Sequence, residues 1–218
     1  MSTPVTDWAA LYAATLDALA DLTAGQPESV ASRVVPATPA WSVRQVLAHL
    51  AGTASDLTTG RMDGAPGQEW TARHVAERDA ATIDDLLGEL RATRPAVEAM
   101  APEATAAVFN AVVHHADLIE ALDSEQQADG LWSPVVEQLR GRWSRLPLRL
   151  DSDPIPDGPI PDDSDDYDDP AATVPVDGYQ LSRALFSRLS RADVVALTGG
   201  RLTDEQIDSL GFFGPPSG

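Results

Sequence analysis

The sequence predicts a mainly α-helical protein, with a four-helix bundle at residues 1–145 and a small α+β appendage at residues 146–218. Apolar residues recur at intervals of three and four through the first two thirds of the chain, the spacing that places them on one helix face. After Pro147, short β-like stretches flank a segment rich in Pro and Asp, and helical spacing then returns. With 218 residues and a hydrophobic fraction of 43%, the chain can build a substantial core.

Four long helices account for the predicted bundle. The first covers "TDWAALYAATLDALADLTAG", and the second begins in "PAWSVRQVLAHLAG", where Ser42 and Gln45 have the spacing of a capping box. A short helix is expected over "TARHVAERD". The third long helix starts near Thr82 and meets Pro95, and the fourth covers "ATAAVFNAVVHHADLIEALD".

The appendage combines short strands and short helices. Before the appendage begins, "SPVVEQLRGRW" predicts a further helix with Pro134 in its first position. "LPLRLD" and "ATVPVDG" predict a small hairpin or two-stranded sheet. "YQLSRALFSRLSRADVVAL" predicts a helix that restarts at Ser190, and "TDEQIDSL" a last helix capped by Thr203 and Gln206.

Charge and composition exclude several classes of protein. The net charge is −19, and nine aspartates with no basic residue lie within residues 151–170, which predicts a mobile acidic loop. A basic patch is missing, so no nucleic acid partner is expected. The chain has no cysteine, which rules out disulfides, thiolate metal sites and a cysteine nucleophile. Neither a long apolar segment nor a secretory signal is visible, so no membrane partner and a cytoplasmic location are expected.

Histidines in "NAVVHHADLIEAL" are the strongest candidates for chemistry. At 100° per residue, Asn110, His114 and Asp117 lie within about 60° of one another on the fourth helix. His115 points about 100° away from His114, so the two adjacent histidines do not share one site. His49 lies on the second helix. A histidine from one helix and an i, i+4 polar pair from another are how bundles build metal sites in their cores.

The spacing alone leaves two interpretations open. A histidine on a mostly apolar helix is more often a core residue that makes one hydrogen bond than a metal ligand or catalyst. His74, in "TARHVAER", is expected to be an exposed helix residue.

Three segments carry a resemblance to a known family. "TPAWSVRQVLAHLAG" is similar to the signature "tPgWtVrdvlaHla", and "VVHHADLIEAL" resembles a second signature in which Asp follows His by three residues. "VDGYQLSRALFSRLSRADVVAL" is similar to a C-terminal segment that reads roughly "v.G.p.eLlraltGRrSraqv". In this order they resemble the mycothiol-dependent maleylpyruvate isomerase-like proteins, a branch of the DinB-like helical bundles. The resemblance spans Trp8 to about Leu210 and implies a DinB-like four-helix bundle.

The resemblance implies a divalent metal, usually zinc, on residues that fall at His49, Asn110 and His114. Asn110 departs from the pattern, because family members carry a carboxylate there and an amide oxygen is a weak, neutral zinc ligand. Some relatives read "HExD" in this helix, which places their Glu at His115. Asp117 is expected to bind the metal itself or to orient His114.

The chemistry that the resemblance implies uses mycothiol, a thiol cofactor. The enzyme would either isomerise a small-molecule substrate or transfer the thiol to it. His49, His114 and Asp117 are the expected catalytic residues. Arg183 and Arg188 match arginines of the family's C-terminal segment and are the expected contacts of an anionic cofactor, while Ser187 replaces the family's Gly. A solvated helix face is the alternative explanation of these arginines.

Three hypotheses on function remain open. The first is a metal-dependent, thiol-using isomerase or S-transferase. The second is a metal-free relative that catalyses a cyclisation or rearrangement in secondary metabolism, and the third is a non-catalytic small-molecule-binding protein. Asn110 favours the second and third, whereas His49, His114 and Asp117 favour the first.

Overall fold

The computed structural model describes residues 6–126, 129–153 and 173–216. The chain forms two compact units, residues 1–131 and 132–218. The division falls before the boundary at residue 145 that we expected, because Trp132 packs with the second unit, where its ring lies 6.3 Å from that of Tyr179. Most of the predicted acidic loop, 154–170 of the segment 151–170, lies outside the described residues.

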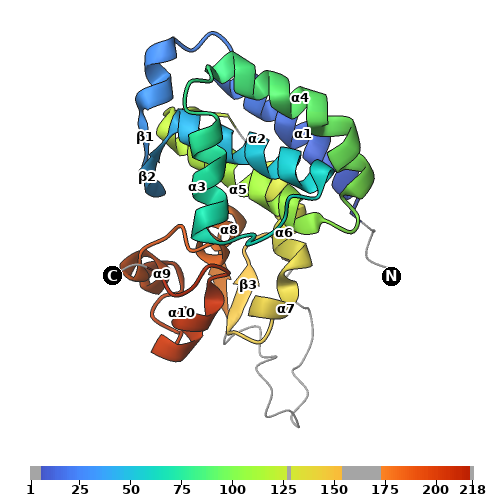
Figure 1. Ribbon diagram of the computed structural model, residues 1–218. Helices are drawn as coiled ribbons and strands as arrows, with labels where there is room; N and C mark the ends of the chain where they lie inside the picture. The colour runs from blue at the N-terminus through green and yellow to red at the C-terminus, as the bar shows by residue number, and fades with distance from the viewer. Residues whose placement is uncertain (1–5, 127–128, 154–172, 217–218) are drawn as a thin grey trace, which may run out of the picture. The chain divides into compact units, whose positions relative to one another are not determined.

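The first unit is the predicted helical bundle, with an added short helix and a two-stranded ribbon. Helices α1, α2, α4 and α5 pack against one another and enclose the apolar core (Figure 1). The elements are, in chain order, α1 (Trp8–Thr23), the 3-10 helix η1 (Glu28–Ser32), β1 (Val34–Val35), β2 (Thr38–Ser42), α2 (Val43–Thr59), α3 (Gln68–Glu77), α4 (Ile83–Met100) and α5 (Thr105–Ala121).

Apolar stripes that the sequence predicts become the core. Leu19, Leu47 and Leu86 come from three different helices and are 0% exposed. Each such side chain stabilises the fold by about 1.5–3 kcal/mol relative to leaving it in water. Burial of apolar side chains therefore stabilises the bundle, and its buried polar residues are not needed to form the apolar core.

Capping starts α2 where the sequence predicts it. The Ser42 side chain accepts a hydrogen bond from the Gln45 backbone N–H, and the Gln45 side chain accepts one from the Ser42 backbone N–H. These bonds satisfy donors that the first turn of a helix leaves unpaired. They also fix the start of the helix that carries His49.

Two features of the first unit differ from the expected structure. The ribbon β1–β2 is antiparallel and pairs Val34 with Ser42, whereas the sequence predicted only the helix that follows. Helix α4 continues through Pro95 to Met100. Beyond the proline, Val97 is fully buried, so packing holds the helix although Pro95 removes one backbone hydrogen bond.

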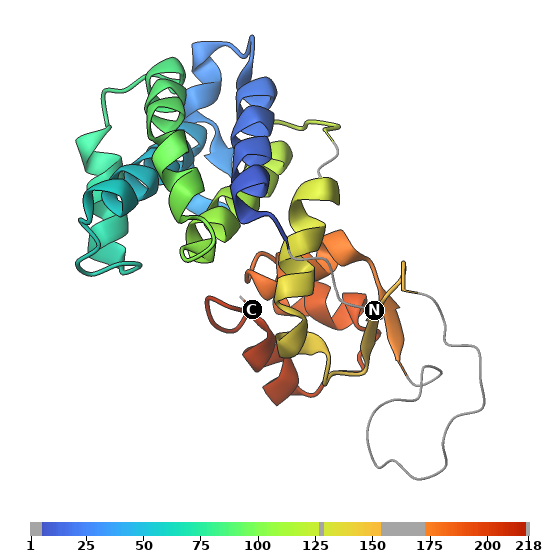
Figure 2. The ribbon, with the colours of Figure 1, turned by 90° about the vertical axis from the view of Figure 1, so that its right-hand side faces the viewer.

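The second unit contains two strands and several short helices. Strands β3 and β4 pair in parallel and lie side by side in Figure 2, so the two-stranded sheet is confirmed and the hairpin is wrong. The described elements are α6 (Asp129–Gln138), which begins in the first unit, α7 (Arg140–Trp143), β3 (Leu148–Leu150), β4 (Val174–Val176), α8 (Gly178–Leu185), α9 (Arg191–Leu197) and α10 (Asp204–Leu210).

Helix ends in this unit follow the sequence in two cases and depart from it in one. Ser190 starts α9 and Thr203 starts α10, each with a complete capping box. Helix α6 begins at Asp129, so Pro134 lies inside it and not in its first position. The earlier start leaves Pro134 in the second turn, where its missing N–H costs one helical hydrogen bond.

None of the helices within residues 6–126, 129–153 and 173–216 combines the length and apolar character that a membrane span requires.

Candidate functional site

Helices α2 and α5 bring His49 and His114 together inside the first unit. The centroids of the two imidazole rings lie 5.3 Å apart, and the rings are close to perpendicular at 79°. Only 6% of His49 and 5% of His114 is exposed. The two histidines therefore lie close together in a mostly dehydrated environment.

Asp117 lies directly behind His114. Its Oδ2 lies 2.9 Å from His114 Nδ1, one helical turn along α5, and the aspartate is 0% exposed. A carboxylate in this position accepts the Nδ1 proton, so it holds the imidazole in the tautomer whose Nε2 has a free lone pair. Asp117 is thus placed to orient His114, one of the two roles that the sequence analysis considered for it.

Asn110 completes the trio that the resemblance assigned to a metal. Its side-chain Oδ1 lies 3.2 Å from His49 Nε2, so His49 contacts Asn110 and lies beside His114 between α2 and α5. A void of about 10 Å³, room for about one water molecule, lies beside Asn110. The void is too small for a substrate-sized molecule, and neither His49 nor His114 lines it.

The donor set at this point fits a resident zinc ion poorly. The trio offers two neutral imidazoles and a neutral amide, with no anion to balance a dication. The Asp117 carboxylate, which contacts His114, is engaged by His114 Nδ1. Within the described part of the chain, no three His, Cys, Asp or Glu side chains are placed to share a metal ion.

His74 is a correction to the sequence analysis, which expected it to be exposed. It is 0% exposed and lies on α3, with its Nε2 3.0 Å from Asp56 Oδ2 and its Nδ1 3.4 Å from His49 Nδ1. The charged neighbours of His74 in the sequence suggested a solvated helix face. In the structure, one of those neighbours, Arg73, contacts the buried carboxylate of Asp56 on α2.

Gly52 explains how α3 comes so close to α2. A Cβ at this position would lie 2.3 Å from His74 Cγ, well inside van der Waals contact. His49, Gly52 and Asp56 form one stripe of α2 at intervals of three and four residues. This stripe is the signal that could have placed His74 from the sequence.

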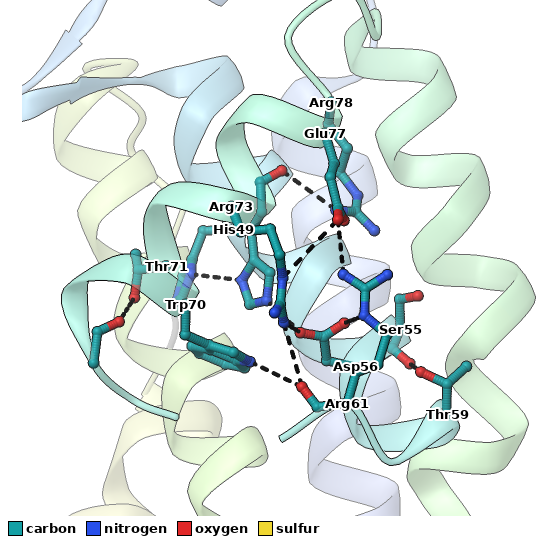
Figure 3. Close-up of polar contacts among 12 residues, drawn as sticks. His49, Ser55, Asp56, Thr59, Arg61, Trp70, Thr71, Arg73, Glu77 and Arg78 are labelled. Carbon is teal, nitrogen blue, oxygen red and sulfur yellow. Dashed lines mark hydrogen bonds and ion pairs between the residues drawn. The ribbon is translucent and has the colours of Figure 1, made fainter. Parts of the chain in front are cut away.

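Asp56 lies at the centre of a network of charged groups. Arg61 Nε lies 3.2 Å from Asp56 Oδ1, and Arg73 Nη2 contacts Asp56 Oδ2, as the dashed lines of Figure 3 show. Both arginines also face Glu77, which lies 2.8 Å from Arg61 Nη2 and 3.9 Å from Arg73 Nε. Asp56 is thus a buried carboxylate with cationic partners.

The pKa values within this network indicate which groups are charged. Burial would raise the pKa of Asp56, but hydrogen bonds from His74 and Arg73 outweigh it and hold that pKa below its ordinary value. Burial lowers the pKa of His74, despite the opposing effect of the hydrogen bond to Asp56. At neutral pH the pair is therefore an ionised carboxylate that accepts a hydrogen bond from a neutral imidazole.

Two tryptophans frame the histidines. Trp41, on the unpredicted strand β2, has its ring centroid 5.1 Å from that of His49 and 5.9 Å from that of His114. Trp70, on α3, lies 4.1 Å from His74 and 6.0 Å from His49. Trp41 is half-buried, so it forms the boundary between the histidine pair and the surface.

His115 is separate from this cluster, as helix spacing predicted. It is 1% exposed, and its Nε2 lies 3.3 Å from Gln126 Oε1. Burial lowers the pKa of His115, opposed by the hydrogen bond with Gln126. His115 is a buried, neutral core residue.

Arg183 and Arg188, the expected cofactor contacts, belong to the second unit. Arg183 is 3% exposed. Arg188 donates to the Phe186 carbonyl at 3.2 Å, and its guanidinium carbon lies 5.9 Å from the centre of the Phe213 ring. Cofactor binding by either arginine stays a prediction.

Comparison with known proteins identifies the first unit. The DinB superfamily matches residues 7–132, more than half of the chain and almost all of the helical bundle. No curated protein and no solved structure matches the sequence. With its bundle and its paired histidines on α2 and α5, the chain belongs to the DinB superfamily.

Proposed function

We propose that this protein is a thiol-dependent isomerase or S-transferase that acts on a small molecule. In this proposal, His49 and His114 transfer protons. The observation that carries the proposal is the pair of buried imidazoles 5.3 Å apart, one of them held by a carboxylate. The reaction class comes from the resemblance to the mycothiol-dependent maleylpyruvate isomerase-like proteins. These proteins are a branch of the DinB-like helical bundles, and this chain belongs to the DinB superfamily.

His114 is the stronger candidate for the base. Because its Nδ1–H donates a hydrogen bond to Asp117, its Nε2 can take a proton from a reacting group. The imidazolium that forms is stabilised by the buried Asp117 carboxylate, at a distance where Coulomb attraction in a protein interior is large. His49, across from it, supplies the second group that a reversible proton transfer needs.

The nucleophile of such a reaction comes from outside the chain, which has no cysteine. A bound thiol, mycothiol in the family that the chain resembles, would supply a sulfur that becomes nucleophilic when it loses its proton. His114 Nε2 takes that proton and returns it at the end of the reaction. Trp41 provides an apolar wall that limits water near the reacting atoms.

Zinc is the weaker part of the resemblance for this chain. His49, Asn110 and His114 would be its ligands, but their lack of negative charge favours proton transfer by the histidines themselves. We therefore assign no step to a metal.

A metal-free cyclisation or rearrangement uses the same two bases and is the second candidate. It is favoured by Asn110, which removes the expected metal ligand while keeping a polar group beside His49. A non-catalytic binding protein would not need the orientation of His114 by Asp117.

The test is turnover by purified protein. Maleylpyruvate with mycothiol assays isomerisation, and an aryl halide with mycothiol assays thiol transfer. We expect His114→Gln to reduce turnover by about 100-fold or more, since general bases contribute that much. His115→Phe, at the adjacent buried histidine, is the matched control and should retain activity. No turnover of either substrate, or an active His114→Gln variant, would overturn the proposal.

A further inference from the structure

The void beside Asn110 lies among the long helices of the bundle and has a mixed lining. Three of its lining residues are polar, and each belongs to a different helix: Tyr12 to α1, Thr53 to α2 and Asn110 to α5. The rest of the lining consists of leucine and alanine side chains. The void is therefore a small space with apolar walls that three polar side chains border.

Thr53 is the residue that indicates a ligand in this void. It is 9% exposed, and its Oγ1 is buried without a hydrogen-bond partner among the described residues. A threonine inside a helix can donate to the carbonyl oxygen four residues earlier, as Thr15 and Thr23 do in α1. Thr53 makes no such bond, although it lies inside α2. Buried hydroxyl groups are normally satisfied by the protein or by ordered water, because leaving them unpaired costs free energy.

Asn110 and Tyr12 bring the complementary groups. Asn110 Oδ1 lies 3.2 Å from His49 Nε2. Because an amide has an acceptor on one side and a donor on the other, the group that remains for a further partner is the Nδ2 donor. Tyr12, which is 3% exposed, adds a second hydroxyl. The three residues thus combine one amide donor with two hydroxyls that can donate or accept.

The size and charge of the void select its ligand. Its volume of about 10 Å³ matches a single water molecule, which needs two to four polar partners to be stable inside a protein. The residues that line it are all uncharged, so the void offers a cation no anionic ligand. Water is the small neutral molecule that can both accept from an amide and donate to a hydroxyl.

We propose that this void is a binding site for one water molecule, which accepts a hydrogen bond from Asn110 Nδ2 and donates one to Thr53 Oγ1. The water holds the amide with its oxygen toward His49, so Thr53 is a positioning residue that acts on Asn110 through the water. The site also accounts for the amide at position 110, since an ionised carboxylate has no donor for the water. It does not depend on the proposed function, because a non-catalytic protein could hold the same water.

The first test is a crystal structure of the wild type, at a resolution that shows ordered waters. The protein is dialysed against a chelator beforehand, so that no metal ion competes for Asn110. We expect electron density for one water within hydrogen-bond distance of both Thr53 Oγ1 and the Asn110 amide. A void without density, or an Asn110 side chain turned away from it, would overturn the proposal, whether or not any variant folds.

Thr53→Val then tests the hydroxyl, because valine keeps the shape of threonine. Loss of a hydrogen bond to the water should lower the melting temperature by about 2–4 °C. In a dry void the same change would remove an unpaired hydroxyl and raise the melting temperature.

The crystal structure of Thr53→Val should show the water lost and the Asn110 amide in a changed or divided orientation. Thr15→Val is the matched control, since Thr15 is also buried but donates to the Leu11 carbonyl within α1. It should leave the water and Asn110 in place. A Thr53→Val variant that is more stable than the wild type, or that keeps both the water and the orientation of Asn110, would contradict the inference. The proposed enzyme function would stand in either case, because its own test is turnover.

Discussion

The His74 ring rests directly on the backbone of Gly52, where a Cβ would come within 2.3 Å of His74 Cγ. Position 52 is inside helix α2, where glycine is a poor helix former and alanine would ordinarily be better. The close contact between α2 and α3 therefore requires glycine at position 52, although its helix propensity is low.

Replacing Gly52 tests this contact. Gly52→Ala should destabilise the protein by about 1–3 kcal/mol, because the added methyl displaces His74 from Asp56. Gly88 in α4 is a matched control, since a Cβ there meets nothing within 4 Å. Gly88→Ala should stabilise by about 0.5–1 kcal/mol. Urea denaturation of both variants measures the difference, and equal effects would mean that α3 moves away from α2 at little cost.

Restoring a carboxylate at position 110 should create a better metal site. Asn110→Glu places an anion one helical turn before His114, within reach of the point where His49 and His114 meet. Thermal melts with and without zinc measure the result. Zinc at 100 times its dissociation constant should add about 2.7 kcal/mol to the stability of the variant and clearly less to the wild type.

Two variants check this result. Adding His49→Ala to Asn110→Glu should abolish the zinc effect, and His115→Phe should leave it unchanged. A wild type that already binds zinc tightly would show that the neutral amide is no obstacle, and would return the metal to the mechanism.

Stability should fall as the pH drops below about 6.5, partly because of His115. Its pKa in the folded protein is lowered by burial from 6.5, so below that pH the unfolded chain binds a proton that the folded chain does not. Each such histidine reduces the free energy of unfolding by up to about 1.4 kcal/mol per pH unit, until the pH reaches its lowered pKa.

Replacing His115 removes its share of this dependence. Between pH values of about 7 and 5, His115→Phe should lose less stability than the wild type, while His74 keeps its own contribution. Urea denaturation at several pH values measures the slope. An unchanged slope would mean that His115 takes up a proton in the folded state as easily as in the unfolded chain.

Ser187 adopts a backbone conformation that favours glycine. Its φ is 57°, directly after helix α8, and its hydroxyl donates to the Gly214 carbonyl at 2.8 Å. Glycine is the usual residue at this position after a helix, and it stands there in the family that the chain resembles. Ser187→Ala keeps the strained φ and loses the hydrogen bond, so it should be destabilised by about 1 kcal/mol.

Ser187→Gly separates the two effects. It relieves the backbone strain while losing the same hydrogen bond, so its stability should lie close to that of the wild type. Thermal denaturation of both variants provides the comparison. An alanine variant as stable as the glycine variant would show that the left-handed backbone has no cost here.

Local signals in the sequence were sufficient for the bundle and for half of the histidine cluster. Helix periodicity predicted that His114 and Asp117 share a face, and the capping residues at Ser42 and Gln45 fixed the start of the helix that carries His49. These features depend on residues a few positions apart. Such spacing is set by helix geometry alone.

The features that the sequence analysis missed depend on contacts between distant segments. His74 is buried only because Gly52 and Asp56, about twenty positions earlier, face it from another helix. The parallel pairing of β3 with β4 joins strands on either side of the acidic segment, where a hairpin was the simpler expectation. Neither contact leaves a periodic signal in its own segment.

Trp41 gives the histidine pair an optical reporter of its own. Its indole lies 5.1 Å from the His49 ring and 5.9 Å from the His114 ring, measured between centroids. A protonated imidazole at such a distance quenches the fluorescence of tryptophan, and a ligand that displaces water from the indole shifts its emission to shorter wavelength. Because this strand places Trp41 against both rings, its fluorescence should follow the protonation of the histidine pair in a variant whose other four tryptophans are replaced.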